Sequence, residues 1–369
     1  MGFDSEHRIF KLADEFGPEL IIYISETKIG LKAILVVDNT AVGPAMGGIR
    51  ISPDVSTTEV ARLARAMTMK NAMARLPHGG GKSGIIADPG LPNKEALIRA
   101  FARKIRHIIE YIPGPDMGTS ETEMAYIRDE INRAVGLPRV LGGIPLDEIG
   151  STGFGVAVCA EVASEYAGLD LGGARLTVEG FGAVGKNAAK FLVERGVVLI
   201  AASDSGGTIY NADGLDVEAL IGIKNATGSV LNYKDGEKLL MTDLFNISTD
   251  IFVPAARPDV ITLSNVDVLD TKMIIEGANI PTTPEAEKLL HQRGVLCVPD
   301  FVANAGGVIT ASVEYHGGTE KHAIEQTEAT IRNNTKEVLE MSRNQSITPR
   351  EAAQSIARHR IKQAMNYRK

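Results

Sequence analysis

The chain has 369 residues, of which 44% are hydrophobic and 23% charged, a composition typical of folded globular proteins of one or two domains. The 46 acidic residues outnumber the 39 basic ones and Trp is absent, so we expect no nucleic-acid partner and no polybasic membrane surface. The two cysteines, Cys159 and Cys297, are too few for a disulfide scaffold, and the sequence holds neither a CxxC pair nor an HExxH motif. We therefore expect no metal site.

Neither export nor membrane insertion is indicated by the sequence. The N-terminus is charged and lacks the apolar core of a secretory signal. No uncharged apolar run approaches the roughly 18 residues of a membrane span. We therefore expect a soluble, cytoplasmic protein without a membrane partner.

The first third of the chain mixes short apolar runs with helical patterns. Strands are predicted at 20–25, 32–38 and 84–88, each bounded by turn residues. Before the last of these, Ser56-Thr-Thr-Glu59 has the spacing of a capping box, in which Ser56 caps a helix and Glu59 reaches back to its backbone. Apolar residues at helical spacing continue to Ala74, and a second helix is predicted over 94–111.

A Gly-rich stretch at 142–155 marks a change of pattern, and we place a domain boundary near residue 150. Beyond it, helices alternate with predicted strands at 176–179, 197–203, 250–253, 273–276 and 295–298. This alternation predicts an α/β fold with a parallel, doubly wound sheet. The chain ends in a helix that begins with a second capping box, Thr348-Pro349-Arg350-Glu351.

A dinucleotide-binding fingerprint follows the first of these strands. Gly180, Gly182 and Gly185 form G-x-G-x-x-G, a helix is predicted over 184–195, and the next strand ends at Asp204. Glycines let the backbone approach a pyrophosphate, and the helix N-terminus offers unpaired N–H groups to it. Asp204 can accept from a ribose 2′-hydroxyl and no Lys or Arg occurs at 203–209, which favours NAD and leaves NADP possible; alternatively, Asp204 only caps a turn.

Two lysines stand out in the first part of the chain. Lys70 lies on the apolar face of its predicted helix, where it either meets an anion or extends its stem to water. Lys82 lies in PHGGGKSG (77–84), which is not a P-loop because Leu76 stands where Walker A needs Gly, and which we interpret as a flexible ribbon that substrate can approach. If the two ammonium groups are close, one can be neutral near pH 7 and act as a base. Asp116, on a rigid turn, either moves protons or caps that turn.

These segments together resemble the glutamate/leucine/phenylalanine/valine dehydrogenases. The resemblance runs in the family's order over most of the chain, through GPAMGGIR (43–50), MTMKNA (67–72), LPHGGGKSGI (76–85), GPDMGT (114–119), STGFG (151–155), GFGAVG (180–185) and ANAGGV (303–308). It implies an α/β substrate and oligomerisation domain at 1–150, completed by the C-terminal helix 345–369, and a Rossmann NAD-binding domain at 151–344. It also implies a homo-oligomer, hexameric or octameric.

The resemblance assigns roles position by position. Lys82 matches the catalytic lysine, Asp116 the catalytic aspartate, and Lys70 the lysine that holds the substrate α-carboxylate. Asn304, with Met46 and Ala311, is placed in the substrate site. The implied cofactor-binding residues are Thr152, Gly180, Phe181, Gly182, Ala183, Val184, Gly185, Asp204 and Asn279. The family oxidises an L-amino acid reversibly to a 2-oxo acid and ammonia with NAD(P); Lys82 would activate water and Asp116 would carry a proton.

Two departures from the glutamate-specific pattern point to an apolar substrate. Met46 stands where those members have Lys, and Ala311 where they have Ser, so the groups that hold the glutamate side chain are missing. An unpaired carboxylate in an apolar pocket costs several kcal/mol. We therefore predict a branched-chain or other apolar L-amino acid. His78 or Arg50 could instead supply a cation, so glutamate dehydrogenase with a rearranged pocket is the alternative. A non-catalytic regulatory paralogue in a hetero-oligomer is a further hypothesis.

Overall fold

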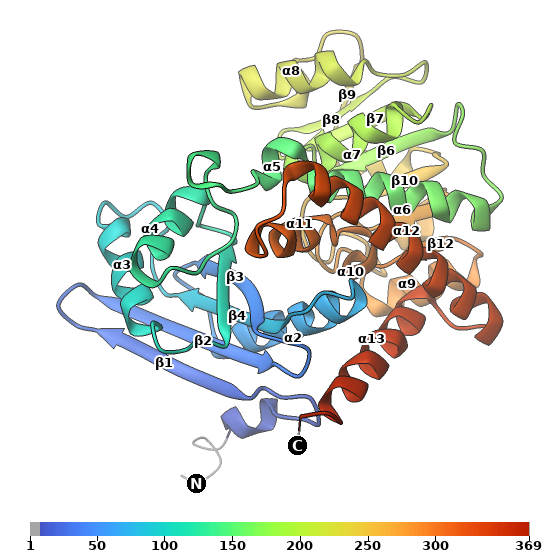
Figure 1. Ribbon diagram of the computed structural model, residues 1–369. Helices are drawn as coiled ribbons and strands as arrows, with labels where there is room; N and C mark the ends of the chain where they lie inside the picture. The colour runs from blue at the N-terminus through green and yellow to red at the C-terminus, as the bar shows by residue number, and fades with distance from the viewer. Residues whose placement is uncertain (1–7, 369) are drawn as a thin grey trace, which may run out of the picture. The chain divides into compact units, whose positions relative to one another are not determined.

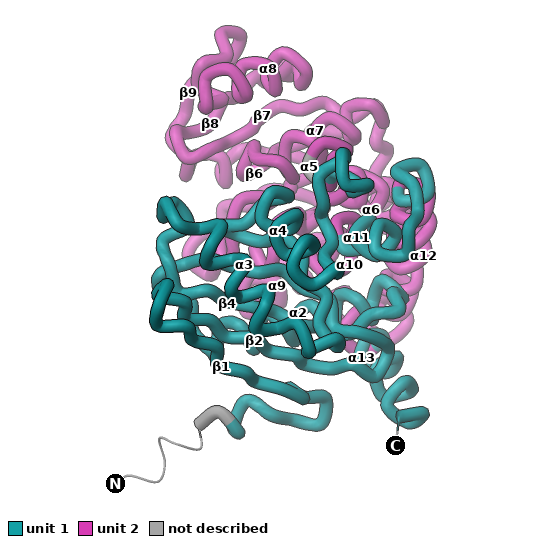
Figure 2. Tube along the Cα trace, turned by 60° about the vertical axis from the view of Figure 1, so that its left-hand side comes forward, with its two compact units in different colours: residues 1–145, 308–323, 356–369 teal, residues 146–307, 324–355 magenta. Residues whose placement is uncertain are grey.

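The computed structural model describes residues 8–368, which divide into two compact units (Figure 2). Unit 1 comprises the described parts of Met1–Pro145, Val308–Ala323 and Ile356–Lys369. Unit 2 comprises Leu146–Gly307 and Ile324–Ser355. Three C-terminal helices are divided between the units: α11 (Gly306–Tyr315), α12 (Glu320–Gln345) and α13 (Pro349–Met365). No helix in residues 8–368 is both long and apolar enough to cross a membrane.

Unit 1 is built on a five-stranded mixed sheet (Figure 1). In spatial order its strands are β1 (Leu20–Glu26), β2 (Leu31–Asn39), β4 (Gly79–Ile85), β3 (Ala45–Ile51) and β5 (Tyr111–Pro115). The pairs β1–β2 and β2–β4 are antiparallel, whereas β3 pairs in parallel with both β4 and β5. The remaining elements of its first segment are η1 (Arg8–Leu12), α2 (Thr57–Met73), α3 (Lys94–Lys104), α4 (Glu121–Ile131) and η2 (Arg139–Leu141).

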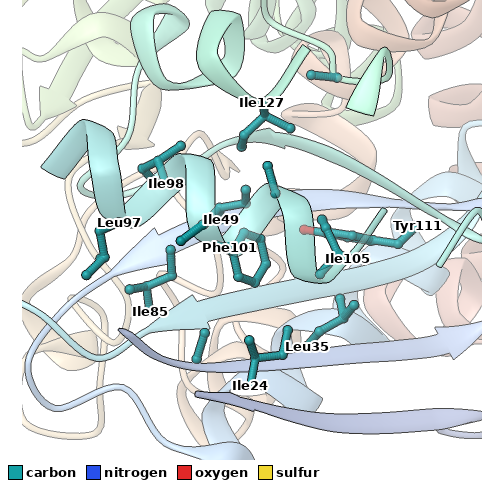
Figure 3. Packing of buried hydrophobic residues seen from close by; sticks show 14 of the residues in the cluster. Ile24, Leu35, Ile49, Ile85, Leu97, Ile98, Phe101, Ile105, Tyr111 and Ile127 are labelled. Carbon is teal, nitrogen blue, oxygen red and sulfur yellow. The ribbon is translucent and has the colours of Figure 1, made fainter. Parts of the chain in front are cut away.

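Both faces of this sheet are buried because helices cover them. Along β2, Leu35 and Val37 pack into a large apolar cluster with α3 and α4, while Ile34 and Val36 pack with α2 on the opposite face. This alternation follows from the two-residue period of a strand. Figure 3 shows the larger cluster, in which side chains such as Phe101 of α3 lie over the sheet. The second predicted helix ends at Lys104 rather than 111, since Tyr111 begins β5.

The glycine-rich segment around Lys82 is a buried central strand, so its interpretation as a flexible ribbon is wrong. Every residue of β4 is buried. A Cβ at Gly80 would lie 2.1 Å from the backbone nitrogen of Thr68, and one at Gly79 would lie 1.8 Å from the carbonyl oxygen of Asn39. The glycines therefore allow α2 and β2 to pack closely against β4. The strand predicted at 84–88 is the end of β4, and β3 was not predicted.

Unit 2 contains a seven-stranded sheet of the predicted doubly wound type. Its order is β12 (Leu296–Val298), β11 (Met273–Ile275), β10 (Ile251–Pro254), β6 (Arg175–Glu179), β7 (Val198–Asp204), β8 (Gly207–Tyr210) and β9 (Glu237–Leu239). The strands from β12 to β7 are parallel, and β8 and β9 add an antiparallel edge. All five strands predicted in this part of the chain are confirmed, each to within a residue or two.

Helices cover the sheet of unit 2 and bury its apolar side chains. For example, Ala286 and Leu290 of α9 pack with Phe252 and Ile274 of the parallel strands. The helical elements of this unit, apart from the shared C-terminal helices, are α5 (Leu146–Ile149), α6 (Ser151–Ala167), α7 (Ala183–Val193), α8 (Val217–Thr227), η3 (Val230–Asn232), η4 (Met241–Asn246), η5 (Val266–Val268), α9 (Pro284–Gln292) and α10 (Asp300–Ala303).

Of the two predicted capping boxes, one is complete. Thr348 Oγ1 accepts from the Glu351 N–H at 3.2 Å, and the Thr348 N–H donates to Glu351 Oε2 at 2.9 Å. At α2, Ser56 caps as predicted by accepting from the Glu59 N–H. Glu59, however, binds Arg50 at 2.6 Å instead of the backbone that the capping box predicts, because an arginine from β3 reaches its carboxylate.

Candidate active site

Lys82 and Asp116 form a buried ion pair in unit 1. Lys82 Nζ lies 3.1 Å from Asp116 Oδ2, and the Lys82 side chain is only 7% exposed. Lys82 is fixed in the middle of β4, while Asp116 follows β5 in a turn closed by Thr119. Thr119 Oγ1 accepts from the Asp116 N–H at 2.9 Å, which orients the turn. Sequence separation hides this pairing, but the β4–β3–β5 order of the sheet produces it.

Arg50 is a third member of the site. The sequence did not predict that it contacts Asp116. Its Nε donates to Asp116 Oδ2 at 3.0 Å, and its other guanidinium arm donates to Glu59 at 2.6 Å. Arg50 lies on β3, between the strands that carry Lys82 and precede Asp116. Asp116 thus faces two cations at once.

The protonation behaviour of the pair follows from burial and from these charges. Burial lowers the pKa of Lys82, and the positive charge of Arg50 adds to that effect, while Asp116 opposes it. Burial alone would raise the pKa of Asp116, but Lys82 and Arg50 outweigh it and lower that pKa. The site therefore favours an ionised aspartate beside a lysine that releases its proton more easily than an exposed lysine. Burial, rather than repulsion from a second ammonium, is the largest cause.

Lys70 lies half-buried in the last turn of α2, which packs against β4. Asn71, its neighbour, donates from Nδ2 to the Gly79 carbonyl at 2.6 Å. Thr68, about one helical turn before Asn71 in α2, lies close to Gly80 of β4. The structure thus brings together the two elements that carry Lys70 and Lys82.

Met46 and Ala311, far apart in sequence, meet in one buried apolar cluster of unit 1. The cluster also contains Ile112 of β5 and Val135, which follows α4. Met46 is 2% exposed and Ala311 6%. The structure therefore joins the two positions that the resemblance placed in the substrate side-chain pocket.

Neither proposed substitute cation is available beside this cluster. His78 is buried, its Nε2 lies 3.1 Å from Ser312 Oγ, and burial lowers its pKa to about 4 with help from His316. It is therefore neutral near pH 7. Arg50 is bound by Asp116 and Glu59.

The glycine turn of unit 2 has the geometry that an anionic dinucleotide requires. Gly180 has φ +89°, and a Cβ at Gly185 would lie 1.9 Å from the Gly180 carbonyl oxygen, so both positions need glycine. Gly182 is exposed and faces open space, and no side chain caps the start of α7 there. The first N–H groups of α7 can therefore bind phosphate oxygens.

The remaining residues of the turn differ in exposure. Phe181 is buried, Ala183 is exposed and Val184 is half-buried. Only Ala183 of these three lies open beside Gly182, so its backbone can contact a bound cofactor.

Asp204 ends β7 and is fully engaged by protein groups. It accepts from the Gly206 N–H at 2.8 Å and from the Val230 N–H at 2.7 Å, and it pairs with Lys224 at 2.7 Å. The turn-capping alternative is therefore present in the structure. Lys224, on α8, is a cation that the local sequence around Asp204 does not reveal, and it weakens the argument against NADP.

The two asparagines assigned to the site contact each other in unit 2. Asn304 Nδ2 lies 3.1 Å from Asn279 Oδ1 and donates to the carbonyls of Gly277 and Ala278. Thr152 lies in the first turn of α6, where a Cβ at Gly307 would be 2.9 Å from its Oγ1. The chain segments at 152, 277–279 and 304–307 thus form one packed group.

A buried Lys–Asp pair in one unit and a glycine turn on a doubly wound sheet in the other define an NAD(P)-dependent oxidoreductase of the amino-acid dehydrogenase class. The model for Glutamate/Leucine/Phenylalanine/Valine dehydrogenase matches residues 142–369, and that for the Glu/Leu/Phe/Val dehydrogenase dimerisation domain matches 21–133. The chain belongs to the Glu/Leu/Phe/Val dehydrogenase family, which confirms the family, fold class and cofactor class predicted from the sequence.

The relatives of this chain include several glutamate dehydrogenases. The chain is 41% identical over 355 residues to the glutamate dehydrogenase of Aeropyrum pernix, covering 89% of this chain and 85% of that protein. It is 40% identical to the NADP-specific glutamate dehydrogenase of Saccharolobus shibatae, with 79% and 72% coverage. It is 35% identical to the NAD-specific enzyme of Staphylococcus aureus, with 89% and 84% coverage.

Solved structures extend the likeness to other substrates. The hetero-hexameric glutamate dehydrogenase of Thermus thermophilus, in its leucine-bound form, has a TM-score of 0.88 and 28% identity, with 98% of this chain and 95% of that chain covered. The L-tryptophan dehydrogenase of Nostoc punctiforme has a TM-score of 0.75 and 28% identity, with 97% and 99% coverage. The fold thus accompanies acidic and apolar substrates alike.

Proposed function

We propose that this protein catalyses the reversible, NAD(P)-dependent oxidative deamination of an apolar L-amino acid, with leucine, valine and isoleucine as the first candidates. The observation that carries this proposal is the buried cluster of Met46, Ala311, Ile112 and Val135. An aliphatic side chain gains stability among such groups, while an unpaired carboxylate there costs several kcal/mol.

The surrounding charges support the same preference. A glutamate side chain needs a cation to pair with its carboxylate. The two cations suggested by the sequence are unsuitable, because His78 is neutral and Arg50 is paired with carboxylates. Taking Arg50 away would remove that cation from the Glu59 carboxylate and leave Asp116 paired with Lys82 alone. The pocket therefore discriminates against an acidic substrate because its side chains are apolar and because neither His78 nor Arg50 supplies a cation.

The acid–base step follows from the Lys82–Asp116 pair. NAD(P), when bound, would supply the hydride acceptor that the oxidation of the substrate Cα requires, and this oxidation would convert the substrate into a cationic imine. Neutral Lys82 takes a proton from water as the water oxygen bonds to that carbon. Asp116, 3.1 Å from Lys82 Nζ, accepts the proton from the resulting ammonium and passes it to the amine of the carbinolamine. The C–N bond then breaks as the C=O bond of the 2-oxo acid forms, ammonia leaves, and the hydroxyl proton passes to Lys82, which is neutral again at this point.

The remaining assigned residues hold the reactants. Lys70 binds the α-carboxylate, which fixes the direction in which Cα faces. Asn279 and Asn304, whose side chains contact each other, present amide groups to the cofactor and to the amino acid respectively. The open glycine at position 182 and the uncapped start of α7 bind the pyrophosphate.

Glutamate is the second candidate substrate, because the named relatives at 35–41% identity are glutamate dehydrogenases. This alternative requires a pocket cation from outside the Met46–Ala311 cluster.

We propose a homo-oligomer, supported by the match to a dimerisation domain. The alternative is a non-catalytic, regulatory role beside a second type of subunit, because one of the similar structures is a hetero-hexamer.

The deciding experiment is the rate of NADH and NADPH formation with a panel of L-amino acids, using the purified protein. Turnover of leucine, valine or isoleucine with little or none of glutamate supports the proposal. Turnover of glutamate alone overturns the substrate assignment. No turnover with any amino acid, together with nucleotide binding, favours a regulatory subunit.

A further inference from the structure

Unit 2 contains a buried charge cluster centred on Arg350, at the start of α13. Its guanidinium contacts Glu276 at 2.6 Å, Glu287 at 2.5 Å and Asp300 at 3.1 Å. Arg350 is 15% exposed and Glu276 fully buried. The capping box of Thr348 and Glu351 fixes the backbone on both sides of Arg350. Three different segments of the unit therefore converge on one side chain.

One guanidinium faces three carboxyl groups, so the cluster holds more acid than base. The pKa of Glu276 is raised to about 8: burial is the largest cause, Arg350 opposes it, and the negative charges of Asp300 and Glu287 act in the same direction as burial. Buried carboxylates without full compensation are costly. The hydrogen bonds of this cluster show which parts of the backbone it holds.

The carboxylates of the cluster bind the backbone of two loops. Glu276 Oε2, the oxygen that Arg350 contacts, also accepts from the Asp300 N–H at 2.9 Å. Asp300 Oδ2 in turn accepts from the Ile280 N–H at 3.0 Å. The loop after β11 and the start of α10 are thus tied to each other through side chains that Arg350 holds.

These two loops carry the asparagines of the site. Asn279 lies between Glu276 and Ile280, and the Asn304 N–H donates to the Asp300 carbonyl at 2.8 Å. Asn304 Nδ2 then reaches the carbonyls of Gly277 and Ala278 and the side chain of Asn279. A continuous set of hydrogen bonds therefore runs from Arg350 to both asparagines.

We propose that Arg350 is a positioning residue: through Glu276 and Asp300 it holds the loops 276–280 and 299–304 so that Asn279 and Asn304 meet the bound nucleotide and amino acid. This inference rests on the proposed function, since the roles of the asparagines come from it. Only arginine can do this here, because its planar fork bonds several carboxylates at fixed angles, whereas lysine offers a single point charge.

The test compares Arg350→Lys with Arg195→Lys. Arg195 is a matched control in the same unit: it is 20% exposed and donates to Glu161 and to the Phe191 carbonyl, far along the chain from both loops. For the intact oligomer we would measure the NADH dissociation constant by nicotinamide fluorescence, kcat and KM for the amino acid, and Tm. We expect Arg350→Lys to weaken NADH binding and to lower kcat/KM by about tenfold, the scale of a small misplacement of binding groups. Arg195→Lys should change neither.

A second pair of variants tests the same inference if Arg350→Lys does not fold. Glu276→Gln keeps an oxygen for the Asp300 N–H, whereas Glu276→Ala removes it. We expect Glu276→Ala to reproduce the loss in NADH binding and kcat/KM, and Glu276→Gln to retain most of both.

The possible outcomes separate the inference from the proposed function. A lower Tm with unchanged NADH binding and unchanged kinetic constants in Arg350→Lys or Glu276→Ala would show that the cluster only stabilises the unit, and would overturn the inference. If the wild type turns over no amino acid, the proposed function fails, but the NADH dissociation constant still decides whether Arg350 positions the loops.

Discussion

Lys82 Nζ and Asp116 Oδ2 lie 3.1 Å apart, within direct proton-transfer distance, although Lys82 lies on β4 and Asp116 in the turn after β5. Neither side chain is held by local sequence. Lys82 is fixed because β4 is buried on both sides, and the Asp116 carboxylate because Arg50 of β3 donates to it. The pair therefore has one geometry in the folded protein, which leads to the first two predictions.

Lys82→Ala should abolish turnover and leave nucleotide binding nearly intact. The loss removes the general base, a contribution of about 10²–10⁴ in rate. The dinucleotide-binding turn belongs to unit 2, so NADH fluorescence should still report binding. Lys94→Ala, which breaks an ion pair with Glu123 in the same unit, is the matched control and should retain turnover. Rates like those of the wild type in Lys82→Ala would refute the assigned role.

The pH dependence of kcat/KM for oxidative deamination should report the Lys82 amine. Activity should rise with pH as Lys82 loses its proton, with a midpoint below the ordinary lysine pKa of 10.5 because burial lowers the pKa. Asp116→Asn removes the negative charge that opposes this lowering of the Lys82 pKa. The rising limb of the pH profile of kcat/KM should therefore move to lower pH while the maximal rate falls. A limb that stays in place or moves upward would contradict the coupling of the two residues.

Met46→Lys combined with Ala311→Ser should move substrate preference toward glutamate. The two positions share one buried cluster, so a new ammonium and a new hydroxyl would face the same space. A paired carboxylate then replaces an unpaired one, a difference of several kcal/mol. The ratio of kcat/KM for glutamate to that for leucine measures the change. Each single variant is the control, since neither alone supplies both partners; an unchanged ratio in the double variant would mean that this cluster is not the side-chain pocket.

The stability of the protein should fall between about pH 5 and pH 8 because of Glu276. Its pKa in the folded state, about 8, lies above the ordinary value of 4.5, so the folded state keeps a proton that the unfolded state releases. Stability from this group is complete below pH 4.5 and is lost as pH rises through 8. The groups that face it are Arg350, Glu287, Asp300 and Cys297. Glu276→Gln should flatten the dependence of Tm on pH, and an unchanged slope would argue that Glu276 is ionised throughout.

Asp204→Asn should raise the use of NADP relative to NAD. The variant removes the negative charge that repels a 2′-phosphate and leaves Lys224, now 2.7 Å from the Asp204 carboxylate, without its counter-ion. We expect the ratio of kcat/KM for NADP to that for NAD to rise by about tenfold, which corresponds to about 1.4 kcal/mol. Lys224→Met should change the ratio in the opposite direction. If both variants leave it unchanged, the adenosine ribose does not contact this pair.

Patterns that repeat within a few residues were predicted well from the sequence. The parallel strands of unit 2, the glycine turn and the Ser56 cap all follow from apolar runs, spacing and local hydrogen bonds. The resemblance located Lys82 and Asp116, and the structure shows them in contact.

Features that depend on distant partners were not predicted. β4 consists largely of glycine and β3 contains Gly47 and Gly48; glycine has a low preference for strands, and these strands form because neighbouring backbone packs against them. Lys224 of α8 contacts Asp204 at the end of β7, and Glu59 binds Arg50 instead of the backbone of its capping box. No local pattern encodes these contacts.

The bare backbone of β4 also limits how the enzyme can be redesigned. A methyl group at Gly79, Gly80 or Gly81 would overlap neighbouring atoms, so a library randomised along this strand should yield almost only unfolded variants. Under the proposed function, directed evolution toward bulkier or polar substrates would therefore have to change Met46 and Ala311 and leave the glycines of β4 in place.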